Sequence, residues 1–395
     1  MREVANKRTG RPFGRFARLG LATLALGGAM ALAACGGSVG GSDDEGEEAQ
    51  QIVATEPGDE LTISNWPLYV DPTNKRNQGT IDEFAEATGI NVEYIEEIND
   101  NQEFFGKVQQ QLQQGDSGGR DMFIVTDYMA GRMFQLGYLQ KLDKSVLDQV
   151  DANLNDDLRS PAFDPKREYS VPWQSGMTGL VVRTDLAPDV DSLADLFDPK
   201  YAGKVTVLSE MYDTVPAVLR IMGIDPATAT KDDFLEAIDV LQEQVDNGQI
   251  RRFTGNGYVR DIEKGDAAIS LGWSGDAVQI ARDDPNIEFV IPTEGCELWS
   301  DNMVIPVGAP NPSGALEFMD YVYDPVVQAD IAEWVNYVTP VKGTSEVLAE
   351  RDPELAENEL IFPTEEFTEN CSTSVTLSPE DEQEVQLAFE GVRGG

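Results

Sequence analysis

The chain has 395 residues, of which 29 are basic, 71 are acidic and none is histidine, so its formal net charge at pH 7 is −42. The lack of histidine excludes a Ser-His-Asp triad, a Cys-His pair and any histidine metal site, and it removes the usual general base near neutral pH. The negative charge would repel nucleic acid and concentrate cations, but a solvated acidic coat is its main expected cause, so the charge alone does not identify a ligand.

Residues 1–34 predict an export signal. A basic stretch over residues 1–18 precedes an uncharged apolar run over residues 19–34, which is shorter than the ~20 residues that span a bilayer. The run ends in LAAC (residues 32–35), which resembles a bacterial lipobox, the motif whose cysteine becomes the lipid-modified first residue. We therefore expect a lipoprotein signal peptide and a mature chain held by lipid at Cys35 on the periplasmic or extracellular face of the cytoplasmic membrane. The alternative is a hydrophobic run with a chance cysteine.

The rest of the chain predicts a tether followed by two α/β lobes. Residues 35–59 are rich in glycine, serine and acids, which is typical of a flexible tether. From residue 61 strand and helix patterns alternate, an order that favours parallel pairing with covering helices and a ligand held at the strand ends between two lobes. Strands are expected at residues 61–65, 91–95, 121–125, 179–183, 204–208, 267–272 and 288–291. Helices are expected at residues 81–88, 101–114, 128–136, 214–222, 231–246, 314–323, 325–335 and 379–391.

Two cysteines remain once Cys35 is assigned to lipid, namely Cys296 and Cys371. In an oxidising compartment we expect them to form a disulfide bond, while two separate buried thiols are the alternative. Two thiols without histidine make a poor metal site. We therefore expect neither a metal nor a cofactor.

The residues that carry chemistry are aromatic and acidic side chains, most of them just after predicted strands. They are Trp66, Tyr69, Thr126, Tyr128, Glu210, Asp213, Trp273, Asp276, Trp299, Asp301 and Tyr337. Singly, such a tryptophan usually packs in a core and such an acid usually caps a helix, an interpretation that fits Glu210 and Asp213. Together at one sheet edge they would form an aromatic, anionic slot. Such a slot suits an alkyl ammonium, because rings accept its stem and its charge and carboxylates accept its N–H donors.

The order of several motifs resembles that of the bacterial spermidine/putrescine-binding proteins of ABC transporters. The likeness extends over about residues 61–391. The motifs are NWPLYV (65–70), DMFIVTDY (121–128), LQKLDKS (139–145), FDPKREYSVPW (163–173), LADLFDPKYAGKVTVL (193–208), LGWSGDA (271–277), PTEGCELWSDNMVIP (292–306) and NYVTP (336–340).

This resemblance implies a fold and a function. The fold is the two-lobed type II periplasmic-binding-protein fold, an α/β fold of mixed sheets flanked by helices with a ligand cleft between the lobes. Lobe 1 is expected over residues 60–172 and 300–342, and lobe 2 over residues 173–299 and 343–395, with hinges near Trp173 and Trp299. A monomeric binding protein would close on spermidine or putrescine and deliver it to an ABC permease in the membrane, without breaking a bond in the ligand.

The resemblance also assigns roles to residues. Trp66 and Tyr69 resemble the family's first aromatic wall, Thr126 falls where the family has a serine, and Tyr128 and Tyr337 fall on family tyrosines. Glu210 and Asp213 fall on an acidic pair that grips amino groups in spermidine-type members. Trp273 resembles a stacking tryptophan, Asp276 the acid of putrescine-type members, and Trp299 and Asp301 an aromatic residue and an acid that holds an amine.

Two features leave the ligand open. The family's late glutamine site should lie near residues 369–374, where this chain reads ENCSTS, and we cannot place it there. The chain also combines putrescine-type and spermidine-type acids. Another small organic cation or amino compound is therefore an alternative ligand. Two alternative functions also stay open. The chain could be a secreted hydrolase that uses Glu210 with Asp301, or a surface lipoprotein with a vestigial cleft.

Overall fold

The computed structural model describes residues 51–75 and 77–394. The expected signal peptide, the lipid site at Cys35 and the first part of the expected tether lie outside the described residues. The strands are β1 (Glu60–Asn65), β2 (Asn91–Glu96), β3 (Met122–Thr126), β4 (Ser170–Arg183), β5 (Val205–Leu208), β6 (Ile250–Thr254), β7 (Ile269–Trp273), β8 (Ile287–Val290) and β9 (Glu297–Val304).

Thirteen α-helices and four short 3₁₀ helices lie between these strands or after the last of them in the described ranges. The α-helices are α1 (Thr80–Thr88), α2 (Asn101–Leu112), α3 (Asp127–Gln135), α4 (Asp148–Asn153), α5 (Met211–Ile221), α6 (Lys231–Asp246), α7 (Tyr258–Glu263), α8 (Ser274–Ala281), α9 (Pro312–Tyr321), α10 (Pro325–Val335), α11 (Thr344–Arg351), α12 (Pro353–Ala356) and α13 (Pro379–Arg393). The 3₁₀ helices are η1 (Lys144–Val146), η2 (Asp156–Leu158), η3 (Leu193–Phe197) and η4 (Pro199–Tyr201).

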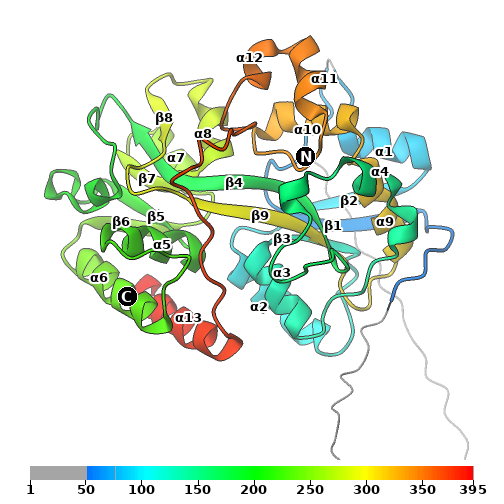
Figure 1. The fold of residues 1–395 in the computed structure, drawn as a ribbon, viewed down its shortest axis with the longest axis horizontal. Coiled ribbons are helices and arrows are strands. Elements are labelled where there is room, and N and C mark those ends of the chain that lie inside the picture. The colour runs from blue at the N-terminus through cyan, green and yellow to red at the C-terminus, as the bar shows by residue number, and fades with distance from the viewer. Residues whose placement is uncertain (1–50, 76, 395) are drawn as a thin grey trace, which may run out of the picture. The chain divides into compact units, whose positions relative to one another are not determined.

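The strands pair in the order β2-β1-β3-β9-β4-β7-β5-β6, with β8 paired to β4. At one end β1 pairs in parallel with β2 and β3, and at the other β5 pairs in parallel with β6 and β7. We call the β1–β3 half with its helices lobe 1 and the β5–β7 half with its helices lobe 2. The antiparallel strands β4 and β9 run across the middle and join the two lobes (Figure 1). The predicted two-lobed α/β fold with mixed sheets is confirmed.

Strands β4 and β9 form the centre of the sheet and pair with strands of both lobes. The first part of β4 and the end of β9 pair beside β3, whereas the second part of β4 pairs with β7 and β8. The register of the β4–β9 pair shifts between Pro172 and Ser175, because a proline cannot donate to the ladder and is tolerated where pairing is irregular. Trp173 lies at this irregularity, and Trp299 lies within β9. Both sequence-predicted hinge residues are therefore on the two crossing strands.

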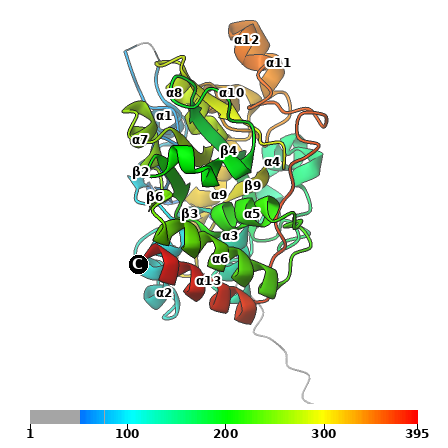
Figure 2. The ribbon, with the colours of Figure 1, turned by 90° about the vertical axis from the view of Figure 1, so that its left-hand side faces the viewer.

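After α10 the C-terminal part of the chain crosses one face of the molecule, from α11 and α12 to α13 in lobe 2 (Figure 1). Leu348 of α11 and Leu355 of α12 pack with Ala332 of α10 in a small apolar cluster of their own, while α13 packs against α6 in lobe 2. Between them, residues 357–378 form a segment that we call the strap. In Figure 1 the strap, drawn in dark orange to red, crosses in front of β4 and β9, and in Figure 2 it runs down the right-hand side of the molecule.

The described end of the expected tether is packed against the body. The side chain of Ile52 is buried in the core, and its N–H donates to the carbonyl of Lys141 at 2.8 Å. The N–H groups of Ala54 and Thr55 also donate to body side chains at 3.0 Å. The flexible tether expected over residues 35–59 is therefore wrong for residues 51–55, because an apolar residue in a polar run provides an anchor. Over the residues that are described, no helix is both long and apolar enough to cross a membrane.

Candidate functional site

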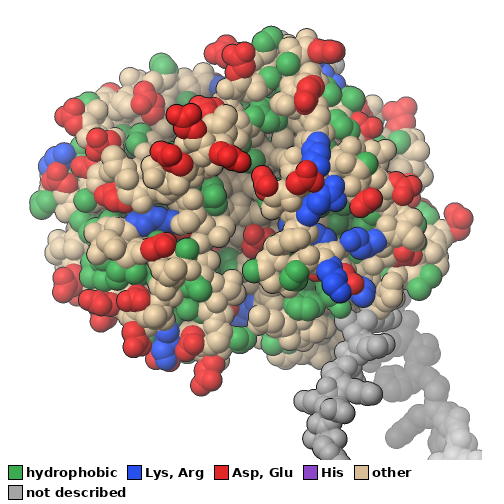
Figure 3. Space-filling model, in the orientation of Figure 1, with side chains coloured by type: hydrophobic (Ala, Val, Ile, Leu, Met, Phe, Trp, Pro, Cys, Tyr) green, Lys and Arg blue, Asp and Glu red, His purple; other side chains and the backbone are tan. Residues whose placement is uncertain are grey.

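A cavity of about 1280 Å³ lies between the lobes and is lined by side chains from both. All eleven sequence-predicted binding residues line it, namely Trp66, Tyr69, Thr126, Tyr128, Glu210, Asp213, Trp273, Asp276, Trp299, Asp301 and Tyr337. Figure 3 shows this face of the molecule hollowed near its centre, with acidic side chains around the hollow. We call this cavity the cleft.

Aromatic rings from the two lobes meet inside the cleft. Trp66, directly after β1 in lobe 1, and Trp273, at the end of β7 in lobe 2, have ring centroids 5.8 Å apart in an edge-to-face arrangement. The ring of Tyr337 lies 5.2 Å from that of Tyr69 and 5.5 Å from that of Trp299. Edge-to-face and tilted contacts at these distances are favourable, and the faces of such rings attract cations and alkyl chains.

Asp301 is held where the two lobes join. It lies inside β9 rather than in a loop, and it pairs with Thr126 at the end of β3. The Thr126 hydroxyl donates to Asp301 Oδ1 at 2.7 Å. Burial raises the pKa of the Asp301 carboxyl to about 7, against the hydrogen bond from Thr126, which lowers it. A positively charged group in the cleft would therefore gain a strong partner here.

Asp213 is the second buried acid, in the first turn of α5. It accepts hydrogen bonds from the Thr178 hydroxyl and, at 3.2 Å, from the indole N–H of Trp273. The indole N–H of Trp299 donates to the same threonine hydroxyl at 3.0 Å. Burial raises the pKa of Asp213 to about 6, and the two hydrogen bonds oppose this shift. The arrangement fixes both tryptophan rings through one carboxylate and one hydroxyl.

Asp276 is the third acid of the cleft, partly buried in the first turn of α8. Its two oxygens accept hydrogen bonds from the hydroxyls of Tyr258, at 2.8 Å, and Tyr337, at 2.7 Å. Burial raises its pKa, while both tyrosines lower it. The carboxylate thus orients Tyr337 toward the other rings of the cleft.

Glu210 differs from the other acids because all three of its hydrogen bonds come from the opposite lobe. It follows β5 in lobe 2, yet its carboxylate accepts from the backbone N–H of Asn101 at 2.5 Å, from the Asn101 amide at 3.1 Å and from the Tyr128 hydroxyl, all in lobe 1. It occupies the N-cap position of α5 without capping that helix through its side chain. Burial, followed by the charge of Asp100, raises its pKa well above the ordinary value.

Several residues that support the site were missed from the sequence. Tyr258 and Thr178 hold two of the acids, and Asp127 lines the cleft with a pKa that burial raises to about 6. Asp127 Oδ1 accepts from the Asn302 amide at 2.6 Å. Asp127 stands beside Tyr128 in a motif already singled out, so the sequence contained a signal for it. Tyr258 and Thr178 come from stretches without such a signal.

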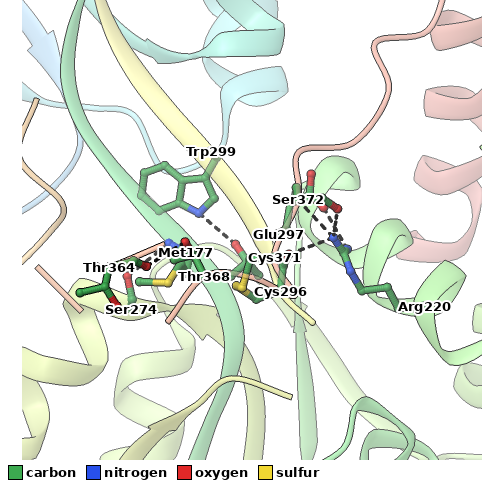
Figure 4. The surroundings of a disulfide bond; sticks show 11 residues. Met177, Arg220, Ser274, Cys296, Glu297, Trp299, Thr364, Thr368, Cys371 and Ser372 are labelled. Carbon is green, nitrogen blue, oxygen red and sulfur yellow. Dashed lines mark hydrogen bonds and ion pairs between the residues drawn. A yellow bond between two sulfur atoms is a disulfide. The ribbon is translucent and has the colours of Figure 1, made fainter. Parts of the chain in front are cut away.

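The strap borders the cleft and is fixed to the start of β9. Cys296 and Cys371, the pair considered from the sequence, form a disulfide bond (Figure 4). The guanidinium of Arg220 donates to the Ser372 hydroxyl at 2.9 Å and forms a buried ion pair with Glu297 at 3.0 Å. The region where the family's late glutamine is expected thus lies on a covalently anchored segment beside the cleft.

Comparison with known proteins identifies the class of this chain. Residues 79–363 match the family of bacterial extracellular solute-binding proteins. The chain belongs to this family. The spermidine/putrescine-binding periplasmic protein of Escherichia coli K12 is 28% identical to this solute-binding protein over 312 residues, which cover 78% of this chain and 85% of the relative. The putrescine-binding periplasmic protein PotF of the same organism is 28% identical over 357 residues, covering 85% and 91% of the two chains.

Solved structures of similar proteins share the fold of this solute-binding protein. A putative spermidine/putrescine ABC transporter from Listeria monocytogenes superposes with a TM-score of 0.75 at 25% identity, covering 85% of this chain and 99% of the other. The spermidine/putrescine substrate-binding protein PotD of Streptococcus pneumoniae superposes with a TM-score of 0.67 at 25% identity, covering 85% and 100%. Membership of the family places the protein outside the cytoplasm, in agreement with the predicted export signal.

Proposed function

We propose that this protein captures a polyamine in the cleft and delivers it to an ABC permease, without acting as an enzyme on it. The observation that carries the proposal is that three acidic side chains of the cleft have no cationic partner. Asp213 and Asp301 are buried and Asp276 is partly buried among aromatic rings, and none of the three pairs with a lysine or arginine of the described residues. Buried carboxylates without a cationic partner are costly, and a guest with several ammonium groups would compensate them.

The aromatic rings support the same class of ligand. Tryptophan and tyrosine faces attract a cation and contact methylene groups, a combination that an alkyl polyamine presents along its whole length. The similar proteins are named for binding spermidine and putrescine, which agrees with this chemistry. Spermidine and putrescine are therefore the ligands that we expect first.

The proposal extends to organisation and location. Closure would occur by movement of residues 60–172 and 300–342 against residues 173–299 and 343–395, with hinges near Trp173 and Trp299. The protein would be a monomer anchored by lipid at Cys35. Ligand would shift its equilibrium toward the closed form, and the permease would bind that closed form. Metabolic labelling with a lipid precursor would test the anchor. We expect the protein to be labelled and its Cys35→Ser variant to stay unlabelled.

Calorimetry tests the proposal. Putrescine, spermidine, spermine and agmatine are titrated into the protein, and we expect saturable binding of at least one of them. Asp301→Asn keeps the shape of the side chain, and we expect it to weaken binding by more than about tenfold, since a charge-assisted bond is lost. Asp239→Asn, on the exposed face of α6, is the matched control and should bind as the unmodified protein does. A protein that binds none of the four amines would refute the proposed function.

A further inference from the structure

A second set of contacts joins the lobes away from the cleft. The hydroxyl of Ser209, after β5 in lobe 2, donates to Asp100 Oδ2 in lobe 1 at 2.8 Å. Arg393, at the end of α13, places Nη1 at 3.5 Å from the same oxygen. Asp100 and Ser209 are buried, and all three residues line a separate cavity of about 360 Å³ rather than the cleft. Their role therefore does not depend on contact with a ligand in the cleft.

The start of α2 is the centre of these contacts. Asp100 is the N-cap of α2 and accepts from the N–H of Glu103 at 3.0 Å. Glu210 reaches the same helix end from lobe 2 and accepts the N–H of Asn101 at 2.5 Å. The first N–H groups of a helix have no partner within the helix, and its dipole favours negative charge there. The start of α2 thus binds two carboxylates, that of Asp100 from its own lobe and that of Glu210 from the opposite lobe.

We propose that Asp100, Ser209, Glu210 and Arg393 form a closure latch, a set of positioning residues that stabilises the closed lobes and so sets the affinity for every ligand of the cleft. The inference rests on the proposed function, in that closure is taken to accompany polyamine capture. Each latch bond joins atoms of different lobes, so it exists only when the lobes are together. The affinity of a ligand is reduced by the fraction of protein that is not binding-competent, whatever the ligand.

This assignment changes the role that the resemblance gives to Glu210. Three donors of the protein itself already serve its carboxylate, two from Asn101 and one from Tyr128. The carboxylates of Asp213 and Asp301 accept hydrogen bonds from hydroxyl and indole groups of the cleft, and they can still accept further hydrogen bonds from an amine. Glu210 therefore joins the two lobes, and the other acids of the cleft bind the amino groups of the ligand.

The backbone of lobe 2 meets lobe 1 closely beside the latch. A Cβ added at Gly255 would lie 2.3 Å from the carbonyl oxygen of Asn99, closer than any real contact. The backbone fixes the position of the Cβ, and the oxygen is itself a backbone atom, so neither can rotate away. A methyl group at Gly255 would therefore act as a wedge that prevents the lobes from closing fully.

The test compares variants outside the cleft. Ser209→Ala, Arg393→Ala and Gly255→Ala are measured by calorimetry with putrescine and with spermidine, and closure is followed by small-angle X-ray scattering with and without ligand. We expect each variant to weaken both amines by the same factor, about 3- to 10-fold for the two side-chain variants and more for the wedge. Arg393→Lys should restore most of the affinity. Gly106→Ala is the control, because a Cβ there meets nothing within 4 Å.

The outcomes separate the latch from the proposed function. Unchanged affinity and unchanged scattering for Arg393→Ala and Gly255→Ala, at unchanged melting temperature, would overturn the latch. A loss that differs between putrescine and spermidine in Glu210→Gln would show that Glu210 holds an amine, which also overturns it. If the unmodified protein binds neither amine, the proposed function fails, and the latch still requires ligand-free Gly255→Ala to scatter as a more open particle than the unmodified protein.

Discussion

Lowering the pH from 8 to 5 should weaken polyamine binding steeply, and the cleft acids set the size of the effect. Burial raises the pKa of Asp301 to about 7 and that of Asp213 to about 6. A bound ammonium would favour the charged carboxylate and lower both values. Below these pKa values the empty cleft holds protons that the ligand must displace, so binding and proton release are coupled.

The magnitude follows from the two pKa values. Each pH unit below the pKa of a group costs about a factor of ten in affinity, provided that the bound form stays charged. At pH 5 Asp301 is about two units below its pKa and Asp213 about one unit, so together they should weaken binding by about 1000-fold relative to pH 8. Above pH 8 the affinity should stay level until the amines of the ligand lose their protons near pH ~10.

Calorimetry at pH 5, 6, 7 and 8, in pairs of buffers with different ionisation enthalpies, measures both the affinity and the number of protons released. We expect a net release that is largest at pH 5, where both acids are protonated in the empty cleft, and close to zero at pH 8. Asp301→Asn should bind more weakly and should lose the contribution centred near pH 7. A constant affinity between pH 5 and pH 8, or the same proton release in Asp301→Asn, would refute the reasoning.

The remaining predictions concern the cleft wall and two buried structural features. Trp273→Ala should weaken polyamine binding by more than about tenfold, because a ring that closes the cleft is lost, and it should also lower the melting temperature, because the ring is buried; calorimetry with unchanged affinity would exclude this ring from the site. Cys296→Ser should lower the free energy of unfolding in urea by about 4 kcal/mol, since its bond to Cys371 closes a loop with a sequence separation of 75, and a difference within 1 kcal/mol would contradict that role. Arg220→Met should cost about 3–5 kcal/mol in the same assay by leaving Glu297 buried and unpaired, and adding Glu297→Leu should recover most of it; a second substitution without recovery would show that the ion pair is not the cause.

The lobes were predictable because their strands follow local rules. β1, β2, β3 and β5 are short runs of apolar and β-branched residues bounded by helices, and they appear in the structure within a residue or two of the expected ranges. The pattern of a strand followed by a helix also determined that parallel pairing would occur in both halves. Local sequence was sufficient there because each such strand packs against its own neighbouring helices.

The crossing strands were not predictable in the same way. Only residues 179–183 of β4 were expected, because Pro172 and Gly176 interrupt the apolar pattern before them. β9 was missed because Ser300, Asp301 and Asn302 resemble a loop. In the structure these polar side chains are paired with distant partners, so the strand is stabilised by contacts that no local pattern contains.

The same distinction applies to the cleft. The aromatic and acidic residues were identified because they follow predicted strands or lie in recognisable motifs, and the structure brings all of them to one cavity. Their supporting partners, such as Thr178 and Tyr258, come from strands and helices far away in the sequence, so only the fold reveals them. The position of Glu210 between the lobes likewise depends on how lobe 1 lies against lobe 2.

A crystal structure of the protein with spermidine tests the central claim most directly. We expect one extended ligand in the cleft, with ammonium nitrogens at about 2.7–2.9 Å from carboxylate oxygens of Asp301 and Asp213, methylene groups against Trp66 and Trp273, and Glu210 still bonded to Asn101. A ligand bound elsewhere, or one whose nitrogens contact neither Asp301 nor Asp213, would contradict the account.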